Sequence, residues 1–333
     1  MSPVKRAKPA SSAATSSTVP FTVEGGATWA RNVRLANDHA EIIITLDVGP
    51  RVISYRRLPD GANVFKTYAE QVGGAGESEW KIRGGHRLWV APESLLSYAL
   101  DNEVHLCVAR VALTCRVGLL QPVLKWEANG SQVEIHSRVQ SGVQKLMGVA
   151  MRPDGSVRVW HKLVNAGTAP LRVAPWALTV CRPGGVEVIP QPPLGKHPRD
   201  LLPNRTVVLW PYTDLKDRRL DLGTQFLRLE QRGDCGPVKF GLAHRGGAVA
   251  YVVDADVFVK RFGMAGDDAE YPDGGVNFET FSNEDMLEVE TLGPLEELGP
   301  GDASAELVEE WTLQATPTGF DVRVDDQVRE LFM

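Results

Sequence analysis

One short stretch, KIRGGHRLWVAPE at residues 81–93, brings together four side chains that could bind or transform a small polar molecule. If the stretch is extended, Arg87 and Trp89 lie on one face and His86 on the other, because side chains of a strand alternate. A guanidinium offers a fork of donors and an indole covers the apolar face of a sugar ring, so the pair suits a polyol. We expect Arg87, Trp89 and Glu93 to contact such a ligand. The alternative is packing alone, with Trp89 in the core, Arg87 paired with Glu93, and His86 hydrogen-bonded at a strand end.

A second candidate stretch is acidic. In an extended segment 286–292, Glu288 and Glu290 project to one face with Cα atoms about 6.5 Å apart, and the opposite face carries Leu287, Val289 and Thr291. Neighbouring carboxylates repel, which raises the pKa of one of them toward the range of a general acid or base. Glu279 stands just upstream in the aromatic segment NFETF. The alternative is a solvated outer face of a sheet.

Other chemistries lack their motifs. The seven histidines show no HxH or HExxH spacing and the four cysteines form no CxxC pair, so we expect no metal site. No glycine-rich loop has the setting and the lysine of a phosphate cradle, and no GxSxG occurs, so we expect no cofactor and no α/β-hydrolase. A net charge of −6, with no basic cluster beyond the first few residues, argues against nucleic acid as a partner.

The sequence also bears on location. No run approaches the roughly 20 apolar residues that span a bilayer, so we expect no membrane partner. Residues 1–20 are rich in Ser and Ala and lack the apolar core of a secretory signal. We expect a disordered leader there, with a degenerate targeting segment as the alternative. The absence of paired cysteines favours a reducing, cytoplasmic setting.

Strand periodicity dominates residues 21–319. EIIITLDVGPRVISYRR (41–57) is typical, with two β-rich runs separated by Gly49-Pro50. Such runs recur with turn signals between them and without a convincing linker. This predicts an all-β protein, an antiparallel sandwich or barrel that forms a single large two-sheet domain with few short helices. Residues 320–333 are predicted to form a C-terminal helix or tail.

Three segments resemble the galactose-mutarotase-like superfamily, and the resemblance implies its fold, a large antiparallel β-supersandwich. NVRLANDHAEIIITLDVGPRVISYRRLPDGANVFK resembles its opening strands, and LEVETLGPLEELGPGDASAELVEEWTL resembles its closing strands. GGHRLWVAPE resembles the Gly-Gly segment that lines the sugar site in hexose-phosphate epimerase relatives, and it is similar to a GGHRLW-type signature of an uncharacterised bacterial branch. The resemblance covers residues 23–316.

The resemblance implies chemistry at a sugar's anomeric centre. In these enzymes a Glu takes the proton of the anomeric hydroxyl while a His donates to the ring oxygen, without a cofactor. Glu279 is the best match to that Glu, with Glu290 as its rival. The strand expected to carry the His reads WALTV and places Trp176 there. His86, from another strand, is then the candidate acid.

Three functions follow as expectations for a chain whose partner is a small-molecule carbohydrate. It is an aldose 1-epimerase-like isomerase that uses Glu279 or Glu290 with His86, or a non-catalytic module in which Arg87, Trp89 and Trp176 hold the sugar beside Glu93 and Glu288. The third is a structural or partner-binding sandwich. That last class predicts a flat face at Arg87 and full solvation of both Glu288 and Glu290.

Overall fold

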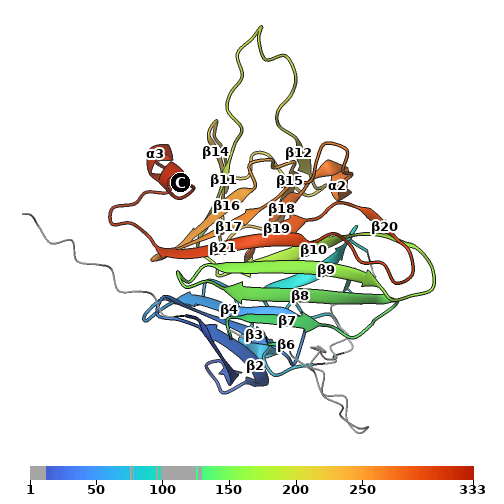
Figure 1. Cartoon of the computed structure of the whole chain (residues 1–333). Coiled ribbons are helices and arrows are strands. Elements are labelled where there is room, and N and C mark those ends of the chain that lie inside the picture. Colours follow the sequence, from blue (N-terminus) through green and yellow to red (C-terminus); the bar gives the residue numbers. More distant parts are fainter. Residues whose placement is uncertain (1–12, 76, 78, 95–96, 99–124, 127–129) are drawn as a thin grey trace, which may run out of the picture.

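Two large antiparallel sheets packed face to face make up most of the chain (Figure 1). The computed structural model describes residues 13–75, 77, 79–94, 97–98, 125–126 and 130–333. The predicted all-β supersandwich is confirmed by this arrangement. Among the described residues, helices are few and short: η1 (Ala69–Gln71), α2 (Pro272–Gly275) and α3 (Asp325–Glu330). None of these described helices is long and apolar enough to cross a membrane.

The first sheet has eleven strands within the described residues. In spatial order they are β1 (Thr15–Thr22), β2 (Thr28–Ala36), β3 (Ala40–Thr45), β4 (Arg51–Arg57), β5 (Gly85–Ala91), β10 (Leu171–Cys181), β19 (Leu287–Leu292), β18 (Phe278–Ser282), β15 (Val238–Leu242) and β12 (Val207–Leu209), with β20 (Glu296–Leu298) paired to β10. Segments far apart in the sequence therefore meet at its centre.

The second sheet has ten strands in the part of the chain that the structure describes. Their order is β13 (Leu220–Leu222), β14 (Phe226–Glu230), β11 (Val186–Pro190), β16 (Ala248–Val253), β17 (Asp256–Phe262), β21 (Leu307–Ala315), β9 (Val157–Asn165), β8 (Val143–Met151), β7 (Gln132–His136) and β6 (Lys125–Trp126). The two sheets enclose a continuous apolar core whose side chains include Ile42, Leu88, Val289, Phe258 and Trp311.

Alternation along the central strands of the first sheet separates two environments. Leu88 of β5 and Val289 of β19 point into the core between the sheets. Arg87 and Glu288, their chain neighbours, lie on the other face of the sheet. Since each strand reverses faces at every residue, a polar residue beside an apolar one is placed outside the core without any break in the strand.

The Gly84-Gly85 pair lets β5 begin close against its neighbours. Both glycines have positive φ, +80° and +72°, which residues with a Cβ rarely adopt. A Cβ on Gly84 would lie 2.1 Å from the Lys66 carbonyl oxygen, and a Cβ on Gly85 would lie 2.2 Å from that of Val52. The glycines therefore fix where Arg87 and Trp89 stand.

The structure bears differently on the predictions for the two ends of the chain. The expectation of a disordered leader over residues 1–20 is wrong for its last part, because β1 begins at Thr15 and pairs with β2. Ser- and Thr-rich composition fits an exposed edge strand as well as a coil. Residues 1–12 lie outside the described part. Within residues 320–333, for which a helix or a tail is predicted, the structure has the short helix α3.

Candidate functional site

A pocket of about 430 Å³ opens on the outer face of the first sheet, within the size range of small-molecule sites. Its floor is formed by the central strands, which supply Arg87 and Trp89 from β5 and Glu288 and Glu290 from β19. Seven aromatic side chains line it: Tyr68, Trp80, Trp89, Tyr98, Trp176, Tyr212 and Phe281. This face is therefore a recess rather than the flat surface of a purely structural sandwich.

The register of the sheet explains why these residues meet. Trp176 of β10 stands opposite Trp89 of β5 on one side. Leu178, two residues on, stands between Arg87 of β5 and Glu290 of β19. Alternate residues of one strand share a face of the sheet, and so do residues paired directly across neighbouring strands. Arg87 and Glu288, about 200 positions apart in the chain, therefore contribute to one surface.

Aromatic rings pack edge to face along one wall of the pocket. The ring centres of Trp89 and Trp176 are 5.5 Å apart, and those of Trp80 and Trp89 are 5.8 Å apart. Tyr98 contacts both Trp80 and Trp89 in the same manner. Trp89 and Trp176 are almost fully buried by these contacts, whereas Tyr212 is 46% exposed. Such contacts hold the wall rigid before any ligand arrives.

Arg87 is bound to an acid from the far segment of the chain. Its Nη1 donates to Glu288 Oε1 at 2.9 Å, and its guanidinium lies 4.8 Å from the centre of the Trp89 ring. Glu93, the acid of the predicted alternative pairing, accepts a hydrogen bond from the Tyr98 hydroxyl. Arg87 is thus held in place by an ion pair and an aromatic face together.

Lys239 of β15 sits between two buried carboxylates. Its Nζ lies 2.8 Å from Glu279 Oε2 and 3.1 Å from Glu290 Oε2. The Trp176 indole also donates to Glu290 Oε2 at 2.9 Å. Glu279 and Glu290 stand directly opposite each other on β18 and β19, so without the ammonium their charges would repel across the strands.

Burial and mutual repulsion shift the pKa values of this group. Burial raises the pKa of Glu279 well above its usual range, and the charge of Glu290 adds to that. Burial likewise raises the pKa of Glu290, with Glu288 adding to it. Burial alone would lower the pKa of Lys239, but the two carboxylates reverse this and raise it. A carboxyl group with a raised pKa at a pocket wall is suited to exchange a proton with a bound molecule.

The structure gathers most of the predicted site residues. Arg87, Trp89, Glu93, Trp176, Glu288 and Glu290 all line the pocket. Glu288 and Glu290 are 6% and 1% exposed, so they are not the solvated outer face of a sheet. Glu279 lies behind the lining, fully buried against Lys239.

His86 does not join the other candidates. It belongs to the opposite face of β5, and its ring is fully buried between the sheets. The expectation that His86 shares the cleft with Glu279 and Glu290 is therefore corrected, and the reason is the alternation that places Arg87 in the pocket. No histidine is among the described residues that line the pocket.

Other lining residues escaped the sequence analysis. Lys239 stands in the apolar run VKFGL, where a single lysine in a buried strand is a usable signal. Tyr68, Trp80 and Tyr212 reach the pocket from connecting segments. A connecting segment shows no periodicity that reports its direction, so nothing in the sequence pointed to them.

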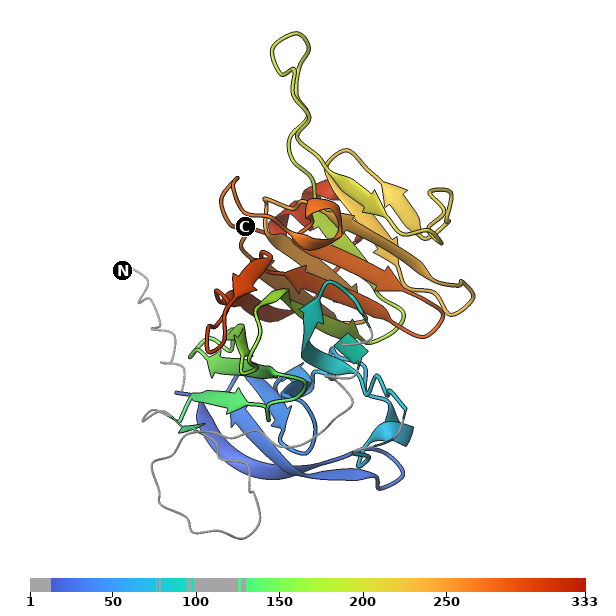
Figure 2. The same cartoon turned by 90° about the vertical axis from the view of Figure 1, so that its right-hand side faces the viewer.

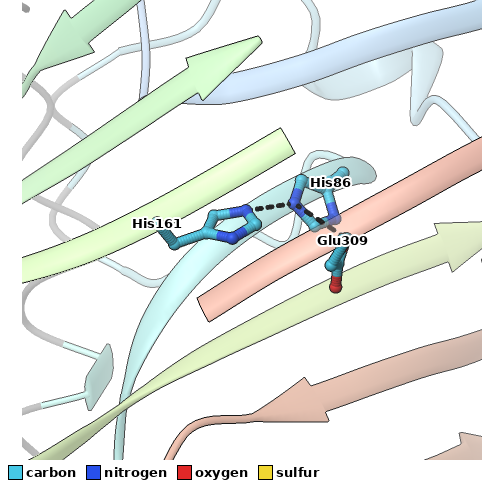
Figure 3. Close-up of side chains that lie close together, drawn as sticks. All are labelled: His86, His161 and Glu309. Carbon is cyan, nitrogen blue, oxygen red and sulfur yellow. Dashed lines mark hydrogen bonds and ion pairs between the residues drawn. The ribbon is translucent and has the colours of Figure 1, made fainter. Parts of the chain in front are cut away.

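His86 takes part in a chain of hydrogen bonds that links the two sheets (Figure 3). Its Nε2 lies 2.7 Å from Nε2 of His161 on β9, and its Nδ1 lies 2.8 Å from Thr179 Oγ1. His161 Nδ1 donates to the Leu307 carbonyl oxygen at 3.0 Å. Lys260 Nζ donates to Thr179 Oγ1 at 2.7 Å.

The Leu307 carbonyl oxygen, at one end of this chain of hydrogen bonds, determines which nitrogen of each histidine carries the proton. Leu307 O can only accept, so His161 carries its proton on Nδ1 and accepts on Nε2. His86 must then donate from Nε2 and accept on Nδ1 the proton of the Thr179 hydroxyl. Burial lowers the pKa of both imidazoles, most strongly for His86, which keeps both rings neutral.

The same cluster has the composition of a metal site, since ligand atoms of His86, His161 and Glu309 lie within 4.8 Å of one another. Glu309, however, already binds the Lys260 ammonium at 3.0 Å and accepts from the Trp311 indole at 2.7 Å. A cation would have to displace the proton shared by the two rings and approach that ammonium. We therefore describe the cluster as a buried hydrogen-bond network that joins the sheets.

No protein-family model and no curated protein matches the sequence. Solved structures do resemble the fold. A galactose mutarotase-like protein from Lactobacillus casei aligns over 85% of this chain and 100% of its own, with a TM-score of 0.53 and 12% identity. The fold of this chain is galactose mutarotase-like.

Two further solved structures are similar to this chain in fold. A putative aldose 1-epimerase from Klebsiella pneumoniae aligns over 96% of this chain and 87% of its own, with a TM-score of 0.50 and 11% identity. A TPR-domain containing protein from Parabacteroides distasonis aligns over 93% of this chain, with a TM-score of 0.54 and 14% identity, and this chain spans 56% of it. Identities this low show the fold alone, so activity has to be argued from the pocket.

The histidine network predicts a loss of stability in acid. The unfolded chain protonates these histidines below about pH 6.5, whereas the folded rings stay neutral to lower pH because their pKa values are lowered. The unfolded state then binds more protons, so stability falls as the pH drops below about 6.5, by up to about 1.4 kcal/mol per pH unit for each histidine.

The measurement is urea unfolding between about pH 5 and 6.5. The double variant His86→Gln/His161→Gln should show a shallower dependence of stability on pH than the wild-type protein. His197→Gln, at an exposed position, is the control and should keep the wild-type slope. Equal slopes for all three proteins would contradict neutral burial of the two rings.

Replacing Lys239 tests the carboxylate pair. Lys239→Met should cost roughly 3–5 kcal/mol at neutral pH, because Glu279 and Glu290 would then be buried without a cation. Their pKa values would rise further above the unfolded values, so the loss should grow as the pH rises above about 4.5 and shrink in acid.

The matched control for Lys239→Met removes the charges together. Lys239→Met/Glu279→Gln/Glu290→Gln should recover much of the lost stability and show little of the added pH dependence. Denaturant unfolding at several pH values measures both effects. A loss below about 1 kcal/mol for Lys239→Met would mean that the lysine is not the required counter-ion.

Proposed function

We propose that this protein binds a carbohydrate in the pocket on the outer face of the first sheet. The observation that carries this proposal is the combination of aromatic rings with fixed donors and acceptors in one recess of about 430 Å³. Sugars present apolar C–H faces and hydroxyl edges, which aromatic rings and charged groups respectively match. The galactose mutarotase-like fold supports the proposal, because two solved structures of this fold are named after mutarotase or aldose 1-epimerase.

The accessible rings give the sugar its platform in this proposal. Trp80 and Tyr98 are partly exposed and Tyr212 is 46% exposed, so a ligand can lie against them. Trp89 and Trp176 are buried and act as the wall behind. The ring faces contact the sugar's C–H groups, and binding removes this apolar surface from water.

The polar floor orients the hydroxyl groups in the same proposal. Arg87 and Glu288 form a donor and acceptor pair at 2.9 Å, and Glu290 offers a carboxylate that Lys239 and Trp176 hold in place. Because the cations here are already matched to carboxylates, the floor suits hydroxyl groups, which both donate and accept. The small-molecule partner is therefore a carbohydrate rich in hydroxyl groups.

A second candidate function is isomerisation at the anomeric carbon. Glu290 favours it, because this carboxyl lines the pocket and burial raises its pKa. As base, Glu290 would take the proton of the anomeric hydroxyl while the bond from the anomeric carbon to the ring oxygen breaks and that oxygen takes a proton from water. After rotation about the bond to the carbonyl carbon, the ring recloses by the reverse of these proton transfers. The described lining offers no imidazole to protonate the ring oxygen, so binding is the better supported function.

Two finer assignments accompany the proposal. We place the chain in a branch of the galactose mutarotase-like proteins marked by the GGHRLW segment, since that segment forms β5 and the pocket floor. We also infer a reducing, cytoplasmic setting, because the two cysteines within the described residues, Cys181 and Cys235, are free thiols.

Ligand screening tests the binding proposal. Neutral hexoses and their oligomers should raise the thermal midpoint of the wild-type protein, because a ligand bound only to the native state stabilises it. Trp80→Ala should remove most of the shift by taking away an accessible ring. The control Trp160→Ala replaces a partly buried tryptophan on β9 that lies in the other sheet and should keep the shift. No shift with any sugar in a broad panel would argue against carbohydrate binding.

Equilibration of anomers tests the catalytic candidate. Proton NMR of freshly dissolved α-anomers should show faster equilibration with the protein than in buffer if Glu290 acts as base. Glu290→Gln should reduce that acceleration by about 100-fold or more, in line with the loss of a general base. Thermal shifts without any acceleration would leave binding as the function.

A further inference from the structure

The charged side chains that line the sugar pocket are unequal in number. Within the described residues, four of them are acidic and two are basic: Glu93, Asp285, Glu288, Glu290, Arg87 and Lys239. Glu279 behind the lining adds a fifth carboxylate, and Lys66, which is paired with Asp285, adds a third cation. Even when Glu279 or Glu290 holds a proton, the carboxylates outnumber the cations by four to three. This excess of negative charge favours a cationic ligand over an anionic one.

Each of the three cations is already paired with a carboxylate, Arg87 and Lys239 as described above. The third, Lys66, donates to Asp285, which also accepts from the Tyr68 hydroxyl at 2.5 Å. An anionic sugar would have to separate one of these pairs before it reached a cation, and breaking a buried pair is costly. This group of charges therefore disfavours sugar acids and sugar phosphates.

Glu93 differs from the other carboxylates of the lining. It follows β5, the teal strand that lies between the blue N-terminal strands and the orange C-terminal strands of the first sheet (Figure 2). Glu93 is exposed, and in the described part of the chain its partner is the neutral Tyr98 hydroxyl, which donates to Oε1 at 2.5 Å. Burial raises the pKa of Tyr98 to about 12 and the bond to Glu93 adds to this, so the hydroxyl keeps its proton. Glu93 is thus an accessible anion without a counter-ion among the described residues.

Two buried polar atoms of the pocket residues also lack a hydrogen-bond partner within the described structure. Glu290 accepts from Lys239 and Trp176 with Oε2, whereas its Oε1 is unpartnered. The indole Nε1 of Trp89 is the other atom. Glu290 and Trp89 are only 1% and 3% exposed, and buried polar groups are nearly always satisfied. A ligand that brings a donor for the carboxylate and a hydroxyl oxygen for the indole satisfies both.

Aromatic rings of the pocket already hold cations against their faces. The Arg87 guanidinium lies 4.8 Å from the centre of the Trp89 ring, and Lys239 Nζ lies 4.7 Å from that of Trp176. Electron-rich ring faces attract a positive charge, Trp and Tyr more than most. Tyr98, whose hydroxyl is bonded to Glu93, brings a partly exposed ring next to the unmatched carboxylate. A ligand cation at Glu93 therefore gains from an ion pair and from an aromatic ring together.

We propose that the carbohydrate of this pocket is an amino sugar, whose ammonium group binds Glu93 beside the Tyr98 ring. The ammonium supplies donors to the carboxylate, and the hydroxyl groups of the same sugar contact Glu290 and Trp89. This inference rests on the carbohydrate proposal and names the ligand class within it. Neutral hexoses make the hydroxyl contacts without the ion pair, so they bind the same pocket less tightly.

Isothermal titration calorimetry with three matched sets of sugars tests this ligand class. Each set consists of a hexose, its 2-amino-2-deoxy form and the N-acetyl derivative, in the gluco, galacto and manno configurations. The measurement is made at about pH 6.5, where an amino group with a pKa near that of an α-amino group is charged. At least one amino sugar should bind about 10-fold more tightly than both its parent hexose and its N-acetyl derivative.

A substitution of Glu93 tests where the ammonium binds. In Glu93→Gln the ratio of the amino-sugar affinity to the parent-hexose affinity should fall from about 10 to near 1, because the carboxylate charge is lost. The matched control is Glu24→Gln, which removes an exposed carboxylate outside the pocket lining and should keep the wild-type ratio. The ratio compares two ligands on one protein, so a general loss of stability in either variant does not change it.

The outcomes separate this inference from the carbohydrate proposal. Equal affinities for hexoses and their amino forms would overturn the amino-sugar assignment and leave carbohydrate binding in place. Tighter binding of glucuronic or galacturonic acid than of the parent hexose would overturn it as well. A wild-type ratio in Glu93→Gln would show that Glu93 is not the ammonium partner. Absence of binding for every sugar in the three sets and for both sugar acids would remove both proposals.

Discussion

Alternation along β5 is the constraint on which the site depends. Arg87 and Trp89 enter the pocket because His86 and Leu88 enter the core, and neither set can move without the other. A slip of one residue would bury a guanidinium between the sheets and expose the imidazole. The positive-φ glycines at the start of the strand and the histidine contact with β9 both hold this register. The register of β5 therefore places the pocket side chains and the core side chains together.

Electrostatic balance is the second organising feature of the pocket. Arg87 is matched by Glu288, and Lys239 is shared by Glu279 and Glu290. Because these charges satisfy one another, the floor stays ordered and buried without a ligand. Three carboxylates face two cations here, so one carboxylate can hold a proton. The raised pKa values of Glu279 and Glu290 agree with this. Binding and proton exchange then share the same side chains.

Sequence reasoning succeeded where the relevant signal was local. The faces of Glu288 and Glu290, and of Arg87 and Trp89, follow from strand alternation alone, and the structure agrees. Lys239 was missed because its neighbours in the sheet come from distant segments, which one sequence does not reveal. His86 was placed wrongly because its motif outweighed the alternation that separates it from Arg87. The edge strand β1 was missed because Ser and Thr suit both coils and edges.

The hydrogen-bonded histidines have a consequence for how the protein can diversify. His86, the chain neighbour of Arg87, joins β5 to β9 of the opposite sheet, so the pocket floor cannot shift to fit a ligand of another shape. Adaptation is left to the connecting segments that bring Tyr68, Trp80 and Tyr212 to the rim. Ligand specificity can therefore change in evolution through these connecting segments while the strands of the pocket floor stay the same.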